Sequence, residues 1–204
     1  MRTAICLSGL ARTFQKTHAL FMRNVVEPLR ARGSVDIFIS IWDSPDLNAL
    51  SAREIGGKST LDLNEIAAVY HPVAMDVESF DSIKGIFQLS HYTQRLCSNH
   101  LLVKDGVLLS APAQYKVLRC NELKRVYERL NNFQYDCVAR TRLDFEIAPL
   151  RVDELDLTKV NVLYDHDGTA GDYFYIANSP NMDKACQVFN NYPYLLNLPD
   201  TDMG

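Results

Sequence analysis

The sequence predicts an α/β fold in which a mostly parallel central sheet is flanked by helices. Two observations lead to this fold class. Apolar runs with strand character alternate with segments of helical spacing, beginning with a strand at 3–8, a helix at 14–29 and a strand at 35–42. Several strands also end directly in small or charged residues. Ligands of open α/β sheets bind at the carboxyl ends of the strands, so we expect a binding site at that edge.

Length and charge set the outer limits. The chain has 204 residues, and its formal net charge is 21 − 25 = −4. This length suits one domain over residues 1–204, and the charge gives no general attraction to nucleic acid or anionic membranes. An anionic ligand would need a local basic pocket. Because the chain ends in polar residues without a closing element, we expect it to be the N-terminal part of a longer polypeptide with further domains.

The cysteines and the apolar runs indicate in which cellular compartment the protein is expected. Five cysteines are widely spaced and form no C-x-x-C pair, at Cys6, Cys97, Cys120, Cys137 and Cys186. This spacing argues against a disulfide framework and against a zinc site. We therefore expect free thiols in a reducing compartment, the cytoplasm. No apolar stretch approaches the roughly 20 residues that cross a bilayer, so no transmembrane segment is expected.

The first strand and the loop after it form a candidate anion site. Ser8 and Gly9 end the apolar run, and Arg12 follows just before the helix that begins with Phe14. Small residues let a ligand approach the backbone, and a helix N-terminus with an added arginine favours an anion. One glycine is no phosphate-loop fingerprint, so a plain tight turn is the alternative.

The second strand, Val35 to Trp42, is rich in β-branched and aromatic residues, and we expect it to pair in parallel with the first. Trp42 and Asp43 would then lie beside the end of the first strand. An aromatic face there could stack on a base, and the carboxylate could accept from a base N–H or a ribose hydroxyl. The alternative for Trp42 is that its ring closes the edge of the core.

The middle of the chain is less regular. The pattern predicts a short helix at Leu63 to Tyr70 and a third strand at Val73 to Glu78, whereas Phe80 to His100 has no clean period. Asp105-Gly106 lies between two apolar runs within Leu101 to Ser110. This arrangement predicts a β-hairpin.

A long helix is predicted from Gln114 to Asn132. One side of this helix is an apolar stripe. The rest of its surface is basic and carries Lys116, Arg119, Lys124, Arg125 and Arg129. We expect most of these charges to form a solvated face. Tyr115, Lys116 and Arg119 are the exceptions, because the front of the helix is expected to face the ligand cleft.

The stretch YDCVARTRLDFE, residues 135–146, takes a buried strand into a charged cluster. If the strand pattern continues, Arg140, Arg142 and Asp144 alternate and point to one face. Arginine can clamp a diphosphate, and a carboxylate can hold a divalent cation that bridges the same phosphates. The alternative is a surface ion pair at a strand end.

Clustered acids lie between the predicted strands Val160 to Tyr164 and Tyr173 to Ala177. Such carboxylates can act as a general base or bind acceptor hydroxyls. Asp172 is the candidate base because it directly precedes a buried strand. A solvated turn fits the other acids better; the next candidates in this loop are Asp165, His166 and Asp167. A final helix is predicted from 179 to 190.

Five segments, in this order, resemble small glycosyltransferases of the GT-A fold: CLSGLART, DIFISIWD, QYKVLRCNELKRVYE, YDCVARTRLDF and GDYFYIANSPNMD. They are similar to virus-encoded members in particular, such as the N-terminal domain of a large multidomain chlorella-virus protein. The resemblance covers nearly the whole chain. It implies a GT-A-like nucleotide-binding sandwich, and host cytoplasm as the location if the protein is virus-encoded.

The resemblance also implies site residues. The nucleotide would be held by Ser8, Gly9, Arg12, Trp42 and Asp43. Asp144 stands where the family's metal-binding D-x-D motif ends, which implies a divalent cation, Mn²⁺ or Mg²⁺. Arg142 replaces the first acid of that motif, so either Asp144 holds the ion together with the diphosphate or Arg142 takes over part of its charge.

The expected function is transfer of a hexosyl or deoxyhexosyl group from a nucleotide-diphosphate sugar, a UDP-sugar first, to a sugar hydroxyl of a glycan. Two alternatives stay open. A sugar-nucleotide nucleotidyltransferase would share the nucleotide site, although no glycine-rich, lysine-bearing loop follows the first strand. The other is a non-catalytic module that binds nucleotide or carbohydrate.

Overall fold

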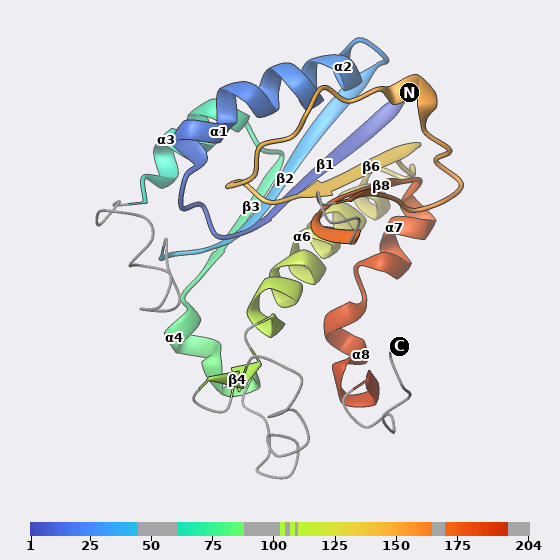
Figure 1. The fold of residues 1–204 in the computed structure, drawn as a ribbon. Coiled ribbons are helices and arrows are strands. Elements are labelled where there is room, and N and C mark those ends of the chain that lie inside the picture. Colours follow the sequence, from blue (N-terminus) through green and yellow to red (C-terminus); the bar gives the residue numbers. More distant parts are fainter. Residues whose placement is uncertain (45–60, 88–102, 105–106, 109, 165–169, 196–204) are drawn as a thin grey trace.

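The central feature is a six-stranded sheet with helices on both faces (Figure 1). The computed structural model describes residues 1–44, 61–87, 103–104, 107–108, 110–164 and 170–195. The order of the strands in the sheet is β3-β2-β1-β6-β8-β7. Their bounds are β1 Arg2–Gly9, β2 Ser34–Trp42, β3 Ala74–Glu78, β6 Cys137–Thr141, β7 Asn161–Tyr164 and β8 Ala170–Ala177.

The sheet is mostly parallel. β1 pairs in parallel with β2 and with β6, and β2 pairs in parallel with β3. β8 runs antiparallel to both of its neighbours, β6 and β7. The predicted α/β class with a mostly parallel sheet is therefore confirmed. The carboxyl ends of β1, β2, β3 and β6 lie at one edge, which we call the carboxyl edge, and β8 begins at that same edge.

Helices form a layer on each face of the sheet (Figure 1). One face carries α1 Phe14–Phe21, the π-helical turn η1 Met22–Val26, α2 Glu27–Arg30 and α3 Leu63–Tyr70. The other carries α6 Ala111–Leu130 and α7 Ser179–Ala185, followed by α8 Val188–Leu195. Shorter elements are α4 Phe80–Ile83, the 3₁₀ turns η2 Lys84–Phe87 and η3 Val152–Glu154, and the hairpin β4 Val103–Lys104 with β5 Val107–Leu108.

Alternate residues of the strands fill two separate cores. Ile5 and Leu7 of β1 pack with the α1 and α3 side, whereas Ala4 and Cys6 pack with α6. The parallel strands are buried on both faces, which explains why β1 reads as a continuous apolar run. The helical layers thus cover the sheet and leave the carboxyl edge as the place where polar groups emerge.

Most predicted elements are confirmed, with local differences. The first predicted helix is present, but its π-helical turn was not predicted. Pro28 has no N–H to donate to the carbonyl of Asn24, and the N–H of Leu150 bonds that carbonyl instead, at 2.9 Å. The predicted final helix is two helices, α7 and α8. The predicted hairpin at Asp105-Gly106 is confirmed by the pairing of Val103 with Leu108.

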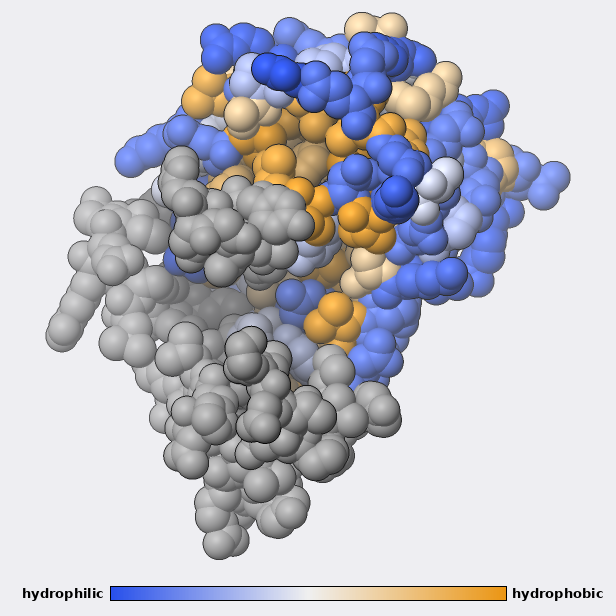
Figure 2. All heavy atoms as spheres, turned by 45° about the vertical axis from the view of Figure 1, so that its right-hand side comes forward, coloured by the Kyte–Doolittle hydropathy of each residue, from blue (hydrophilic) through white to orange (hydrophobic). Residues whose placement is uncertain are grey.

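Four described cysteines are free thiols and are buried, namely Cys6, Cys120, Cys137 and Cys186. Burial raises the pKa of Cys137 and of Cys186 to about 12. Cys97 lies outside the described residues. No helix in the described part of the chain is long and apolar enough to span a membrane. On the face drawn in Figure 2, hydrophilic residues cover most of the described area and apolar residues gather in its centre.

Candidate functional site

The sheet topology marks one point on the carboxyl edge. β1 is followed by α1 on one face of the sheet, whereas β6 is reached through α6 on the opposite face. The connections to the two neighbours of β1 therefore lie on opposite sides, so the carboxyl ends of β1 and β6 form the topological switch point of the sheet. Ligands of doubly wound sheets bind at such a switch point. The candidate site is assembled from the residues that end these two strands.

The end of β1 is open to a ligand. Gly9 has φ +105°, a left-handed conformation that favours glycine, and a Cβ placed on it would meet nothing within 4 Å. Ser8 is fully buried, and its Oγ makes no hydrogen bond to any described residue. Buried hydroxyls are normally paired, so this one stands out beside the open space at Gly9.

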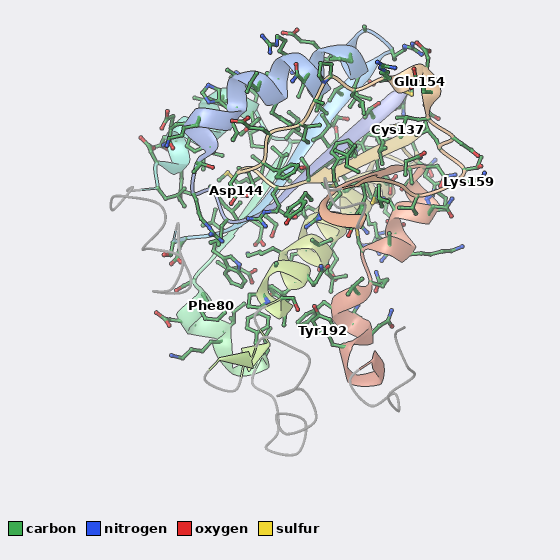
Figure 3. All side chains as sticks on the ribbon, viewed as in Figure 1. Phe80, Cys137, Asp144, Glu154, Lys159 and Tyr192 are labelled. Atoms are coloured by element: carbon green, nitrogen blue, oxygen red, sulfur yellow. The ribbon has the colours of Figure 1, made fainter. Side chains whose placement is uncertain are left out.

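The end of β6 forms a tight ion pair. The strand ends at Thr141, so Arg142 and Asp144 lie in the turn after it rather than at alternate strand positions. Arg142 donates from Nε and from its terminal nitrogen to the two oxygens of Asp144, both at 2.8 Å. Figure 3 shows Cys137 at the start of β6 and Asp144 beyond its other end. This two-point pair is the strong, oriented form of an arginine–carboxylate contact.

The first helix fixes the backbone of this turn. Thr17 donates from Oγ1 to the carbonyl of Leu143 at 2.6 Å, and Thr13 reaches the carbonyl of Asp144 at 3.4 Å. These threonines flank the N-terminus of α1, which follows the β1 loop directly. The two strand ends of the site are therefore tied together by hydrogen bonds.

Arg12 completes the cluster. Its Nε lies 3.8 Å from Asp144, and the exposed fraction of the side chain is 24%. The Nε is buried, and Arg12 donates no hydrogen bond to any described residue. Arg12, Arg142 and Asp144, which we call the switch-point cluster, thus sum to 2 − 1 = +1 formal charge. The described groups here fit an anion, and a diphosphate is the anion expected from the sequence.

The described groups do not fit a resident divalent cation. Both oxygens of Asp144 accept from Arg142, and its side chain is only 7% exposed. A cation there would have to displace one guanidinium and lie beside another. Within the described part of the chain, no three His, Cys, Asp or Glu side chains gather as a possible metal site. The metal at Asp144 therefore stays a prediction that this donor set does not support.

Trp42 and Tyr115 form an aromatic cluster instead of an open platform. Trp42 is fully buried, and its ring stacks on Tyr115 with centroids 5.9 Å apart. Phe80 and Phe87 contact Trp42 edge-on at 5.5 and 6.0 Å. The geometry thus favours the second of the two roles expected for Trp42, closing the edge of the core. Figure 3 shows Phe80 on the α4 side of this region.

Beside this cluster lies Lys116, whose burial and pairing with two acids were not predicted. Lys116 has no exposed surface, and its Nζ lies 2.6 Å from Glu78, 3.3 Å from Asp76 and 4.5 Å from the Trp42 ring. Tyr115 donates to Glu78 at 3.0 Å, and burial together with that bond raises the pKa of Tyr115 to about 12. The sequence signal that could have indicated this pairing was the presence of two acids in the third strand, Asp76 and Glu78.

The remaining predicted residues are placed in part. Asp43 is exposed after β2, and its N–H bonds the carbonyl of Glu78 at 3.0 Å. The backbone of Asp172 belongs to β8, two residues before Phe174, which pairs with Thr141. Asp172 therefore lies at the carboxyl edge, but its side chain, like all of residues 165–169 with Asp165, His166 and Asp167, lies outside the described set.

Two arginines of β6 and its turn lie over tyrosines of β8. The guanidinium carbon of Arg140 lies 5.3 Å from the ring of Tyr175, and that of Arg142 lies 5.7 Å from the ring of Tyr173. Arg140 is only 2% exposed, whereas the side chain of Arg142 is 27% exposed. Of the two, Arg142 is the one that a ligand at the edge can reach.

The sequence matches no protein-family model and no curated protein.

Proposed function

We propose that the protein is a glycosyltransferase of the GT-A type. It would transfer a hexosyl or deoxyhexosyl group from a nucleotide-diphosphate sugar, a UDP-sugar first, to a sugar hydroxyl of a glycan. One observation carries the proposal: Arg12 is a mostly buried cation at the switch point that donates no hydrogen bond to any described residue. A departing diphosphate is the charge that such a preformed cationic site would stabilise.

The chain's own residues supply two sides of the proposed reaction. The bond from the anomeric carbon to the phosphate oxygen breaks, and a bond from that carbon to the acceptor oxygen forms. Arg12 and Arg142 stabilise the charge on the leaving diphosphate, and the open backbone at Gly9 lets it approach. The acceptor proton would pass to Asp172, which adjoins Tyr173, the residue beneath Arg142.

The same proposal includes the surroundings of the enzyme. Buried free thiols support a reducing compartment, the cytoplasm, or the host cytoplasm if the protein is virus-encoded. A glycan acceptor would be its partner. The proposal requires no divalent cation, because Arg12 and Arg142 supply positive charge for the diphosphate.

The test is a panel of UDP-, GDP- and dTDP-sugars incubated with the protein and scored for free sugar. We expect slow hydrolysis of one donor, because a transferase without acceptor leaks sugar to water. A nucleotidyltransferase would require pyrophosphate and release a nucleoside triphosphate. A binding module would retain a nucleotide or a sugar without turnover. The proposal is contradicted if no donor is hydrolysed, with or without Mn²⁺ and a glycan acceptor mixture.

A further inference from the structure

The role of Asp144 follows from its contacts. Its two carboxylate oxygens accept the two parallel bonds from Arg142, and the second arginine, Arg12, lies 3.8 Å away. The backbone carbonyls of Leu143 and Asp144 accept from the threonines of the α1 N-terminus. Asp144 is therefore held in place by contacts to both its backbone and its side chain.

We propose that Asp144 is a positioning residue for Arg142, and that this site takes the diphosphate without a divalent cation. The inference rests on the proposed function, because the diphosphate is the ligand of that site. The pair with Asp144 engages the Nε and one terminal nitrogen of the Arg142 guanidinium. The pair fixes the plane of the guanidinium, so little ordering is left to occur when an anion binds.

The stacked rings of Tyr173 and Phe145, which we call the shelf, also hold Arg142 in place. Tyr173 lies under the Arg142 guanidinium at 5.7 Å and stacks on Phe145 with centroids 4.5 Å apart and an interplanar angle of 8°. Phe145 directly follows Asp144, so one turn supplies the carboxylate and one ring of the shelf. The arginine is thus held on an edge and on a face, which suits arginine and not lysine.

The experiment measures UDP affinity by calorimetry, once in chelator and once in saturating Mn²⁺. The wild type is expected to bind with dissociation constants that agree within about threefold. Asp144→Asn should change the affinity by the same factor in both conditions. Arg142→Lys keeps the charge and should still lose about tenfold, the size of one charge-assisted hydrogen bond. Asp153→Asn, in a surface pair with Arg32, is the matched control and should bind as the wild type does.

A double variant separates positioning from mere support of the fold. If Asp144 acts through Arg142, then Asp144→Asn combined with Arg142→Gln should bind UDP no more weakly than Arg142→Gln alone. Additive losses would overturn the positioning role. Wild-type binding that rises tenfold or more with Mn²⁺, and loses that gain in Asp144→Asn, would make Asp144 a metal ligand. Failure of the wild type to bind UDP in either condition would instead contradict the proposed function.

Discussion

Two charged clusters of this molecule differ in how completely they are paired. At the rear of α6, the closed cluster consists of Lys124, Arg125, Glu128 and Asp183, which balance at two cations and two anions. Lys124 has no exposed surface and reaches Ser179, Asp183 at 2.8 Å and Glu128 at 3.1 Å. Ser179 donates onward to Glu128 at 2.8 Å. The cluster joins α6 to α7, and its buried lysine is met by three partners.

The switch-point cluster has the opposite character. Arg12 donates no hydrogen bond to any described residue, and its Nε lies 3.8 Å from Asp144. Pairing of a buried charge serves stability, because removing Lys124 would leave Glu128, which is only 8% exposed, without its buried cation. Incomplete pairing at a sheet edge leaves a charged group that can bind a ligand. The comparison therefore assigns stability to one cluster and binding to the other.

The largest effect is expected in the closed cluster. Lys124→Met would leave Glu128 and Asp183 without their buried cation, and the free energy of unfolding should fall by about 3–5 kcal/mol. Urea unfolding followed by circular dichroism measures the loss. The control is Lys159→Met, whose side chain is 79% exposed and pairs with Asp156 at the surface. That control should stay within about 0.5 kcal/mol of the wild type. If Lys124→Met lowered the free energy of unfolding by less than about 1 kcal/mol, the stabilising role assigned to the closed cluster would be contradicted.

An intermediate effect is expected at Lys116, the second buried lysine of α6. Its partners Asp76 and Glu78 are 18% and 23% exposed. Of the acids around Lys124, Asp183 is similarly exposed at 26%, but Glu128 is only 8% exposed, so water solvates it poorly when its lysine is removed. Lys116→Met should therefore lower the free energy of unfolding by about 1–3 kcal/mol, less than Lys124→Met. The same urea titrations rank the two variants, and the reverse ranking would show that exposure of the partners does not govern the cost.

Sequence patterns predicted the strands and the main helices because those depend on neighbours in the chain. Val35 to Trp42 became β2, and Leu63 to Tyr70 became α3 at the predicted residues. Arg12, Arg142 and Asp144 were predicted as site residues because strand ends meet at one edge, and the structure brings them together. Their chemistry as a site stays a prediction.

The buried lysines show what the pattern could not supply. Lys124 was expected on a solvated face, and that prediction is wrong, since Lys124 is fully buried. Its partner Asp183 lies 59 residues away in the chain, and the Asp76 partner of Lys116 lies 40 residues away. Helical periodicity reads only the residues of one helix, so an acid delivered by another element stays invisible to it. The alternation expected from Arg140 to Asp144 failed for a related reason, because the threonines of α1 hold the chain in a turn after Thr141.

The most direct measurement is calorimetric titration of Arg12→Gln with pyrophosphate and with UDP. Arg12 makes no hydrogen bond to the described residues, so its replacement should leave the free energy of unfolding within about 0.5 kcal/mol of the wild type. Affinity for both ligands should fall about 10- to 100-fold, the equivalent of a lost charge-assisted hydrogen bond. Arg151→Gln removes the same charge from a side chain that is 78% exposed, and it should bind both ligands as the wild type does. Unchanged affinity in a folded Arg12→Gln protein would contradict an anion site at the switch point.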